Sequence, residues 1–168
     1  PAGLDCSDHE VNIKIALGAA VAAGTLTLEQ RNEVLADMTD EVGELVLDDN
    51  RAQGLALAIA RRQALPMVNV HSRYLNTLES EGWLNRALEF LPTDRQIAER
   101  QSAGTGLTTP EFSVLLAYTK TANVAEMVRS DLPDDAYLEP DLVRYFPQRL
   151  QREFHDQILG HRLRREIV

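Results

Sequence analysis

Cysteine and long apolar runs are both scarce in this sequence of 168 residues. The single cysteine, Cys6, rules out an internal disulfide framework and favours a reducing compartment, so we predict a cytoplasmic protein. The longest apolar run, residues 15–23, spans nine residues, which is too short to cross a membrane. No charged segment followed by an apolar one precedes this run, so we expect no secretory leader.

Short catalytic and nucleotide-binding motifs are also missing. The sequence contains no G-x-G-x-x-G, no P-loop, no H-E-x-x-H and no G-x-S-x-G. The glycines of "AGTG" at 103–106 follow a predicted helix rather than a strand, which is typical of a helix end and a turn. The residues alone therefore predict no self-sufficient active site.

Positive charge is scarce in the first part of the chain. The net charge is −9, and residues 1–50 account for all of it, with eleven acidic and two basic side chains. Such a segment repels nucleic acid, so we predict no nucleic-acid partner. The arginines near the end alternate with acids, which favours an exposed or inter-helix face over a phosphate-binding patch; they are Arg149, Arg152, Arg162, Arg164 and Arg165.

Helix signals dominate the rest of the sequence. Thr27 with Gln30, and Thr93 with Gln96, have the spacing of a capping box. The alternating apolar residues at 11–17 would also suit a strand, but no second strand pattern offers a partner. We therefore predict an all-α, bundle-like or orthogonal array without significant sheet. The expected helices are 8–23, 27–63 with a break near 37–39, 67–81, 84–91, 93–103, 109–129, 139–146 and 148–166.

The stretch "DCSDHE" at 5–10 gathers six side chains that could bind a metal or move a proton. Cys6 and His9 could form half of a zinc site, but no second close pair of ligands completes it, so no metal site is predicted. The surrounding acids disfavour a thiolate, and we expect a buried, inert Cys6. Ser7 and Glu10 fit a capping box at the start of a helix, which explains the stretch without invoking a function.

Longer stretches of sequence identify a family more specifically than these residue spacings do. The chain resembles the large-subunit bacterial NAD-specific glutamate dehydrogenases in seven blocks that occur in the family's order and are distributed along nearly the whole sequence: "GLDCSDHEVNIKIAL", "LTLEQRNEVLADMTDEVGELVL", "LNRALEFLP", "GLTTPEFSVLLAY", "SDLPDDAYL", "RYFP" and "HRLRREI".

The resemblance implies that the chain is a fragment of an oxidoreductase that oxidatively deaminates L-glutamate to 2-oxoglutarate and ammonia with NAD. The first residues lack a methionine and the last stop within a helical pattern, so both ends are expected to be cut. The family's nucleotide-binding glycines and its catalytic lysine and aspartate would lie upstream of Pro1. We therefore expect the fragment to be inactive, with NAD, L-glutamate and 2-oxoglutarate bound by the parent enzyme, which we expect to be a homo-oligomer without a membrane partner.

The resemblance also divides the chain and assigns one site residue. Residues 1–62 are expected to be the closing helices of the catalytic core, and 63–168 the start of a C-terminal helical extension. "GLDCSDHE" resembles the family pattern Gly-Val, two residues, Ser, two residues, Glu, whose serine helps to bind the substrate side-chain carboxylate. That role falls on Ser7, and a hydroxyl at a helix N-terminus would suit it. Asp8 and Glu10 would oppose an anion unless they are paired or turned away.

A second hypothesis belongs to another class of function. The charge-alternating end of the chain is also typical of a helical interaction or regulatory module, in which residues 65–168 mediate subunit contacts or respond to an effector.

Overall fold

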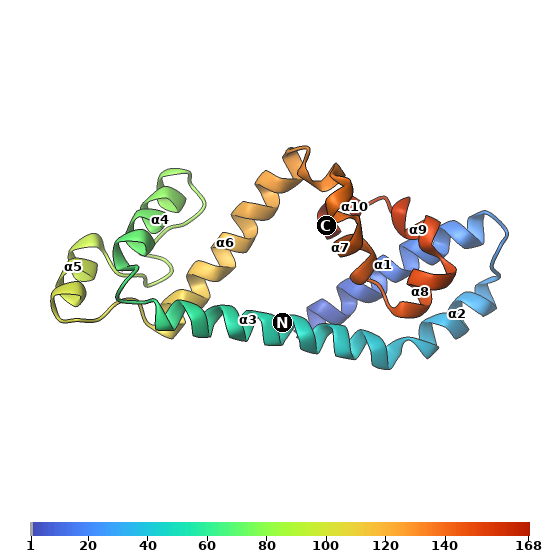
Figure 1. The fold of residues 1–168 in the computed structure, drawn as a ribbon, viewed down its shortest axis with the longest axis horizontal. Coiled ribbons are helices and arrows are strands. Elements are labelled where there is room, and N and C mark those ends of the chain that lie inside the picture. The colour runs from blue at the N-terminus through green and yellow to red at the C-terminus, as the bar shows by residue number, and fades with distance from the viewer. Residues whose placement is uncertain (1) are drawn as a thin grey trace. The chain divides into compact units, whose positions relative to one another are not determined.

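The structure is a computed structural model, and it describes the backbone of residues 2–168 and the side chains from Leu4 onward. Within this range every regular element is a helix and no strand occurs, which confirms the all-α prediction (Figure 1). The elements are α1 (Ala2–Ala22), α2 (Leu28–Asp37), α3 (Thr39–Arg62), α4 (Val68–Ser80), α5 (Asp94–Ser102), α6 (Thr109–Arg129), the 3₁₀ turns η1 (Leu132–Asp134) and η2 (Ala136–Leu138), α7 (Glu139–Arg144), α8 (Gln148–Glu153), α9 (His155–Leu159) and α10 (Arg164–Ile167).

The chain forms two compact units. Unit 1 consists of the residues up to Arg51 together with Met127–Val168, and unit 2 consists of Ala52–Glu126. The boundaries between the units fall inside α3 and α6. Unit 1 is therefore built from two separate stretches of sequence, whereas unit 2 is continuous.

The predicted capping boxes start two of the helices. Thr27 Oγ1 accepts a hydrogen bond from the Gln30 N–H at 3.2 Å, and the Gln30 side chain accepts one from the Thr27 N–H at 2.9 Å. Thr93 and Gln96 make the same reciprocal pair at the start of α5. Each box satisfies two backbone donors that would otherwise lack partners. The predicted break near 37–39 is also confirmed, because α2 ends and α3 begins on either side of the buried Met38.

Three predicted helices differ from the structure. The helix predicted at 8–23 begins at Ala2. Residues 84–91 form turns, because the Asn85 side chain accepts the N–H groups of Ala87 and Leu88 and so competes with helical bonding. The helix predicted at 148–166 is divided into α8, α9 and α10. The first division occurs at Phe154, whose φ of −133° and ψ of 34° are not helical.

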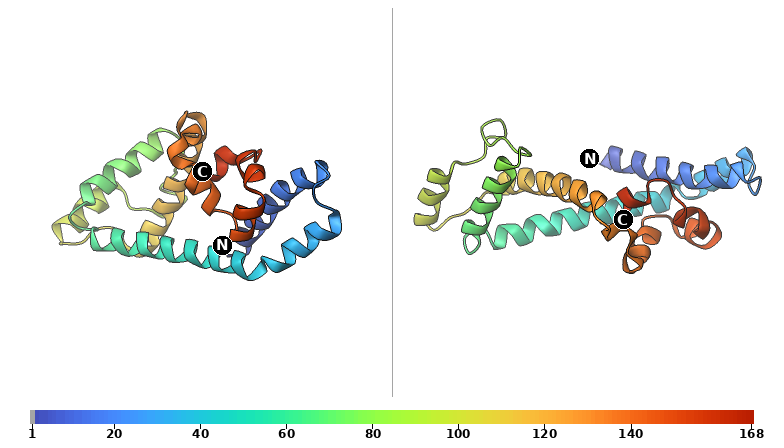
Figure 2. Two further views of the ribbon diagram at one scale, coloured as in Figure 1. Left: turned by 45° about the vertical axis from the view of Figure 1, so that its right-hand side comes forward. Right: turned by 90° about the horizontal axis from the view of Figure 1, so that it is seen from above.

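The core of unit 1 joins the two ends of the chain. Helix α1 packs against α2 and α9, and α9 also packs against α7 and α8. Both views in Figure 2 show α1 and α2 as neighbours connected by the short turn that follows Ala22. The fully buried side chains at the centre come from both sequence stretches: Ile13, Leu17, Met38, Phe146, Leu150 and Ile158.

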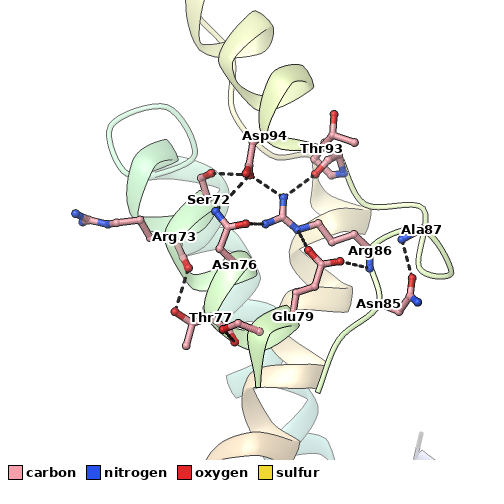
Figure 3. A network of polar contacts seen from close by, with 12 residues as sticks. Ser72, Arg73, Asn76, Thr77, Glu79, Asn85, Arg86, Ala87, Thr93 and Asp94 are labelled. Carbon is pink, nitrogen blue, oxygen red and sulfur yellow. Dashed lines mark hydrogen bonds and ion pairs between the residues drawn. The ribbon is translucent and has the colours of Figure 1, made fainter. Parts of the chain in front are cut away.

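The core of unit 2 is apolar but contains one buried cation. Arg86 is only 6% exposed. Its Nη1 donates to Asp94 at 2.8 Å and to the Pro92 carbonyl at 3.3 Å, its Nε lies 3.1 Å from a Glu79 oxygen, and its Nη2 donates to Asn76 (Figure 3). Figure 3 shows the guanidinium between α4 and the start of α5, so Arg86 holds the 81–93 segment against α4. The buried apolar residues of the unit 2 core include Leu75, Leu78, Leu84, Ile97, Leu107 and Phe112.

No helix between residues 2 and 168 combines the length and the hydropathy needed to cross a bilayer.

Candidate functional site

Ser7 lies inside α1 rather than at its start. It is the sixth residue of the helix, so its N–H is not among the first four that lack an intrahelical acceptor. The predicted Ser7 capping box is therefore wrong. Glu10, which would have had to turn back toward Ser7, instead contacts Lys14 one turn further on. For the same reason Ser7 does not lie at an anion-binding helix N-terminus.

The Ser7 side chain is exposed. No hydrogen bond to its hydroxyl is formed by the side chains described from Leu4 onward. The exposed side chain of Ser7 faces away from the buried core of unit 1.

Cys6 is exposed, which corrects the prediction that it is buried. It borders a hollow of about 1010 Å³ in unit 1, whose other walls come from the start of α3 and from α8. The hollow is lined by acidic Asp40 and Glu44 as well as by basic Arg149 and Arg152. The exposure of Cys6 follows from its place on α1, because the buried face of this helix continues through His9, Ile13 and Leu17 instead.

His9 is the buried residue of the "DCSDHE" stretch at 5–10. Its side chain is stacked on Tyr145, with ring centroids 4.2 Å apart. Its Nε2 lies 3.9 Å from an Asp49 oxygen, which is too long for a hydrogen bond. Burial lowers the pKa of His9, although the charges of Asp49, Asp5 and Asp8 act in the opposite direction. The six side chains of "DCSDHE" are therefore spread around a helix and do not converge on one point.

The structure joins three further polar residues to His9. Asn12 Nδ2 donates to the Tyr145 hydroxyl at 2.9 Å. The Leu163 N–H donates to His161 Nδ1 at 3.1 Å, so the proton of a neutral His161 must lie on Nε2, which contacts the Asn12 carbonyl at 3.0 Å. Burial lowers the pKa of His161 and raises that of Tyr145, so both rings remain neutral near pH 7.

We name this set the His9 cluster: His9, Asn12, Asp49, Tyr145 and His161. It connects α1 to α3, to the end of α7 and to the turn after α9. Both imidazoles are 3% exposed, so neither can exchange a proton directly with a solvent-borne substrate. The cluster is therefore an internal polar contact of unit 1, whereas Ser7 and Cys6 face outward.

Sequence reasoning missed three members of the cluster: Asn12, Tyr145 and His161. A signal for Asn12 existed, because it follows His9 at a spacing of three and so shares its helix face. Tyr145 and His161 had no local signal, since they are more than 130 residues from their partners in the sequence. Among the side chains that the structure describes, no group of three His, Cys, Asp or Glu residues could hold a metal ion.

Two family models match the chain. The model described as bacterial NAD-glutamate dehydrogenase, catalytic domain, matches residues 1–60. The model described as glutamate dehydrogenase, C-terminal, matches residues 104–168. The sites discussed above fall within these two ranges.

Three curated relatives are similar over 99% of the chain, and each is named NAD-specific glutamate dehydrogenase. They come from Pseudomonas aeruginosa (50% identical), Halomonas elongata (45%) and Mycobacterium tuberculosis (44%). The chain spans about 10% of the length of each relative. From the two family models and these relatives we conclude that the chain belongs to the family of bacterial NAD-specific glutamate dehydrogenases.

Proposed function

We propose that this chain is a segment of an NAD-dependent enzyme that oxidatively deaminates L-glutamate to 2-oxoglutarate and ammonia. The observation that carries the proposal is the 44–50% identity, over 99% of the chain, to proteins named NAD-specific glutamate dehydrogenase. The single cysteine supports a cytoplasmic location for the parent enzyme.

The proposal includes a division of the chain near residue 62, between closing helices of the catalytic core and a C-terminal helical extension. The family models support this division, because the catalytic-domain model stops at residue 60 and the C-terminal model starts at residue 104. The compact units follow a different boundary, since unit 1 combines residues from both matched ranges. On this proposal, the start of the extension completes the core of the closing helices.

NAD is proposed to bind the parent enzyme outside this chain. Dinucleotides bind where a glycine-rich turn links a strand to a helix, and residues 2–168 contain no strand. The isolated chain should therefore produce no NADH from L-glutamate. Adding increasing amounts of the chain to a solution of NADH should leave the NADH fluorescence unchanged. Saturable NADH binding would contradict the placement of the cofactor site outside the chain.

Ser7 is proposed to contact the side-chain carboxylate of glutamate in the parent enzyme. Its exposure supports this role, which no longer depends on a helix N-terminus. In the full-length enzyme, Ser7→Ala should raise the KM for glutamate about tenfold, because a hydrogen bond to a charged group contributes roughly 1.5–3 kcal/mol. The KM for NAD should not change.

Ser113→Ala is the matched control for Ser7→Ala, because Ser113 is also an exposed helical serine. Its hydroxyl donates to the Thr109 carbonyl, so its loss should leave both KM values unchanged. If Ser7→Ala leaves the KM for glutamate at the wild-type value in a stable enzyme, Ser7 does not bind the substrate.

A second candidate function is a helical interaction module that mediates subunit contacts in a homo-oligomeric parent. It is favoured by the large apolar side chains that unit 2 exposes, above all Leu88 at 73% and Phe90 at 91%. Sedimentation of the chain over a range of concentrations tests this function. A strict monomer at the highest concentration would count against self-association.

A further inference from the structure

A hollow of about 520 Å³ in unit 2 is lined by three arginines, Arg61, Arg62 and Arg100. We name it the arginine hollow. Its remaining walls are the turn after α3, at Ala64 and Leu65, and the segment that precedes α6, with Gly104, Thr105, Gly106 and Thr108. The volume lies in the range of roughly 300–1,000 Å³ that is usual for small-molecule sites.

The walls of the arginine hollow are held together by a close backbone contact. A Cβ at Gly106 would lie 2.2 Å from the Ala64 carbonyl oxygen, so only glycine permits this approach. Arg61 Nη1 also reaches across to the Leu107 carbonyl at 3.4 Å. The two arginines that end α3 are thereby kept beside the segment that carries Thr105 and Thr108.

The charges around the hollow are only partly neutralised. Arg100 Nη1 donates to Glu111 Oε2 at 2.7 Å, and the same oxygen accepts the Thr108 N–H at 2.7 Å. For Arg61 and Arg62, by contrast, no carboxylate partner is present in the described part of the chain. Other acids of unit 2 are engaged elsewhere: Glu79 and Asp94 with Arg86, and Glu99 with Arg95.

We propose that the arginine hollow binds the oxyanion group of a small molecule, a phosphate or a carboxylate. A guanidinium matches both groups, because its planar fork of donors can make two parallel hydrogen bonds to their oxygens. Arg61 and Arg62 supply two such forks without a competing carboxylate. Favourable interaction with the C-terminal dipole of α3 accounts for basic residues at this position, but it does not account for their place at a hollow with a third arginine.

The test is calorimetric titration of the 168-residue chain with inorganic phosphate and with malonate, with sodium chloride holding the ionic strength constant. The test variant is Arg61→Gln/Arg62→Gln, which keeps much of the alkyl chains while removing both charges. The matched control is Arg73→Gln/Arg95→Gln, which removes two exposed charges of the same unit away from the hollow. Circular dichroism and urea unfolding verify that each variant folds.

Binding of either anion by the wild type and the control, with binding at least about tenfold weaker in the test variant, supports the proposal. Whether phosphate, malonate or both bind then shows which kind of oxyanion the hollow accepts. The proposal is overturned if neither anion binds the wild type, or if both double variants weaken binding equally, since that reflects total charge. It is also overturned if the test variant loses stability but binds the anions as tightly as the wild type does. The two arginines would then only stabilise the C-terminus of α3 through its dipole.

Discussion

The imidazole of His9 lies on the phenol ring of Tyr145, with centroids 4.2 Å apart and planes inclined by 20°. Burial shifts the pKa of each ring in the direction that keeps it neutral, downward for His9 and upward for Tyr145. A neutral His9 gains little from Asp49, whose oxygen is 3.9 Å away. The ring stack and the Asn12 hydrogen bond therefore link α1 to the end of α7, whereas the contact between His9 and Asp49 adds little to the link between α1 and α3.

Stability should fall when the pH is lowered through the range just below about 6.5. Burial lowers the pKa of His9, His71 and His161, so the unfolded chain takes up protons at a higher pH than the folded chain. The histidine contribution is complete above the unfolded pKa, declines as the pH falls toward the folded pKa values, and levels off below them. Urea unfolding at a series of pH values measures this slope.

Single histidine variants identify the source of that slope. His161→Gln should reduce the pH dependence, because burial lowers the pKa of His161 in the folded chain. A free energy of unfolding that stays flat between about pH 8 and pH 5 would contradict the prediction.

Replacement of Arg86 should destabilise unit 2. Arg86→Met should lower the free energy of unfolding by about 2 kcal/mol, because it removes a buried, multiply bonded cation whose partners remain partly solvated. Arg86→Lys should recover only part of the loss, since an ammonium cannot reproduce the contacts to Glu79, Asp94 and Asn76. Arg95→Met is the control, with an expected loss below about 0.5 kcal/mol, because Arg95 is 88% exposed.

The helix caps offer a direct comparison with Ser7. Thr27→Ala should cost about 1 kcal/mol of stability, because it removes the acceptor of the Gln30 N–H at the start of α2. Ser7→Ala should change stability by less than about 0.5 kcal/mol, because Ser7 is exposed within α1 and caps nothing. Urea unfolding of both variants checks the difference. Equal losses would place Ser7 at a cap after all.

Two glycines should respond to alanine in opposite directions. Gly106→Ala should destabilise the chain by about 1–3 kcal/mol, because the new Cβ would be forced against the Ala64 carbonyl. Gly54→Ala should stabilise it by about 0.5–1 kcal/mol, because Gly54 lies within α3 with open space around it. Thermal unfolding monitored by circular dichroism measures both. A stabilising Gly106→Ala would show that the loop does not press on Ala64.

Local signals predicted the parts of the fold that depend on neighbours in the sequence. The Thr27–Gln30 and Thr93–Gln96 boxes were correct because a cap needs only residues three apart. The same spacing misled at Ser7, where Glu10 bonds forward to Lys14. A serine followed by a glutamate is compatible with a helix start and with a helix interior, and the pattern does not distinguish them.

The parts of the fold and of the site that local signals did not predict depend on tertiary contacts. Residues 84–91 have helical composition, yet burial of Arg86 among Glu79, Asn76 and Asp94 holds them in turns. The His9 cluster depends on pairs such as Asn12 with Tyr145, which are 133 residues apart. No periodic pattern in the sequence predicts a pairing over such a distance. The sequence could therefore indicate that residues 5–10 carry reactive side chains, but not which of these side chains would be buried.

The discontinuous make-up of unit 1 has a consequence for the order in which the chain folds during synthesis. The core of unit 2 draws its buried residues from 64–122, so it is complete once that stretch has left the ribosome. In unit 1, Ile13, Leu17 and Met38 must wait for Phe146 and Ile158, which are synthesised after the whole of unit 2. Closing so long a loop is slow compared with local folding. The apolar face of α1 is therefore covered later than the core of unit 2, and a chaperone would need to protect it in the meantime.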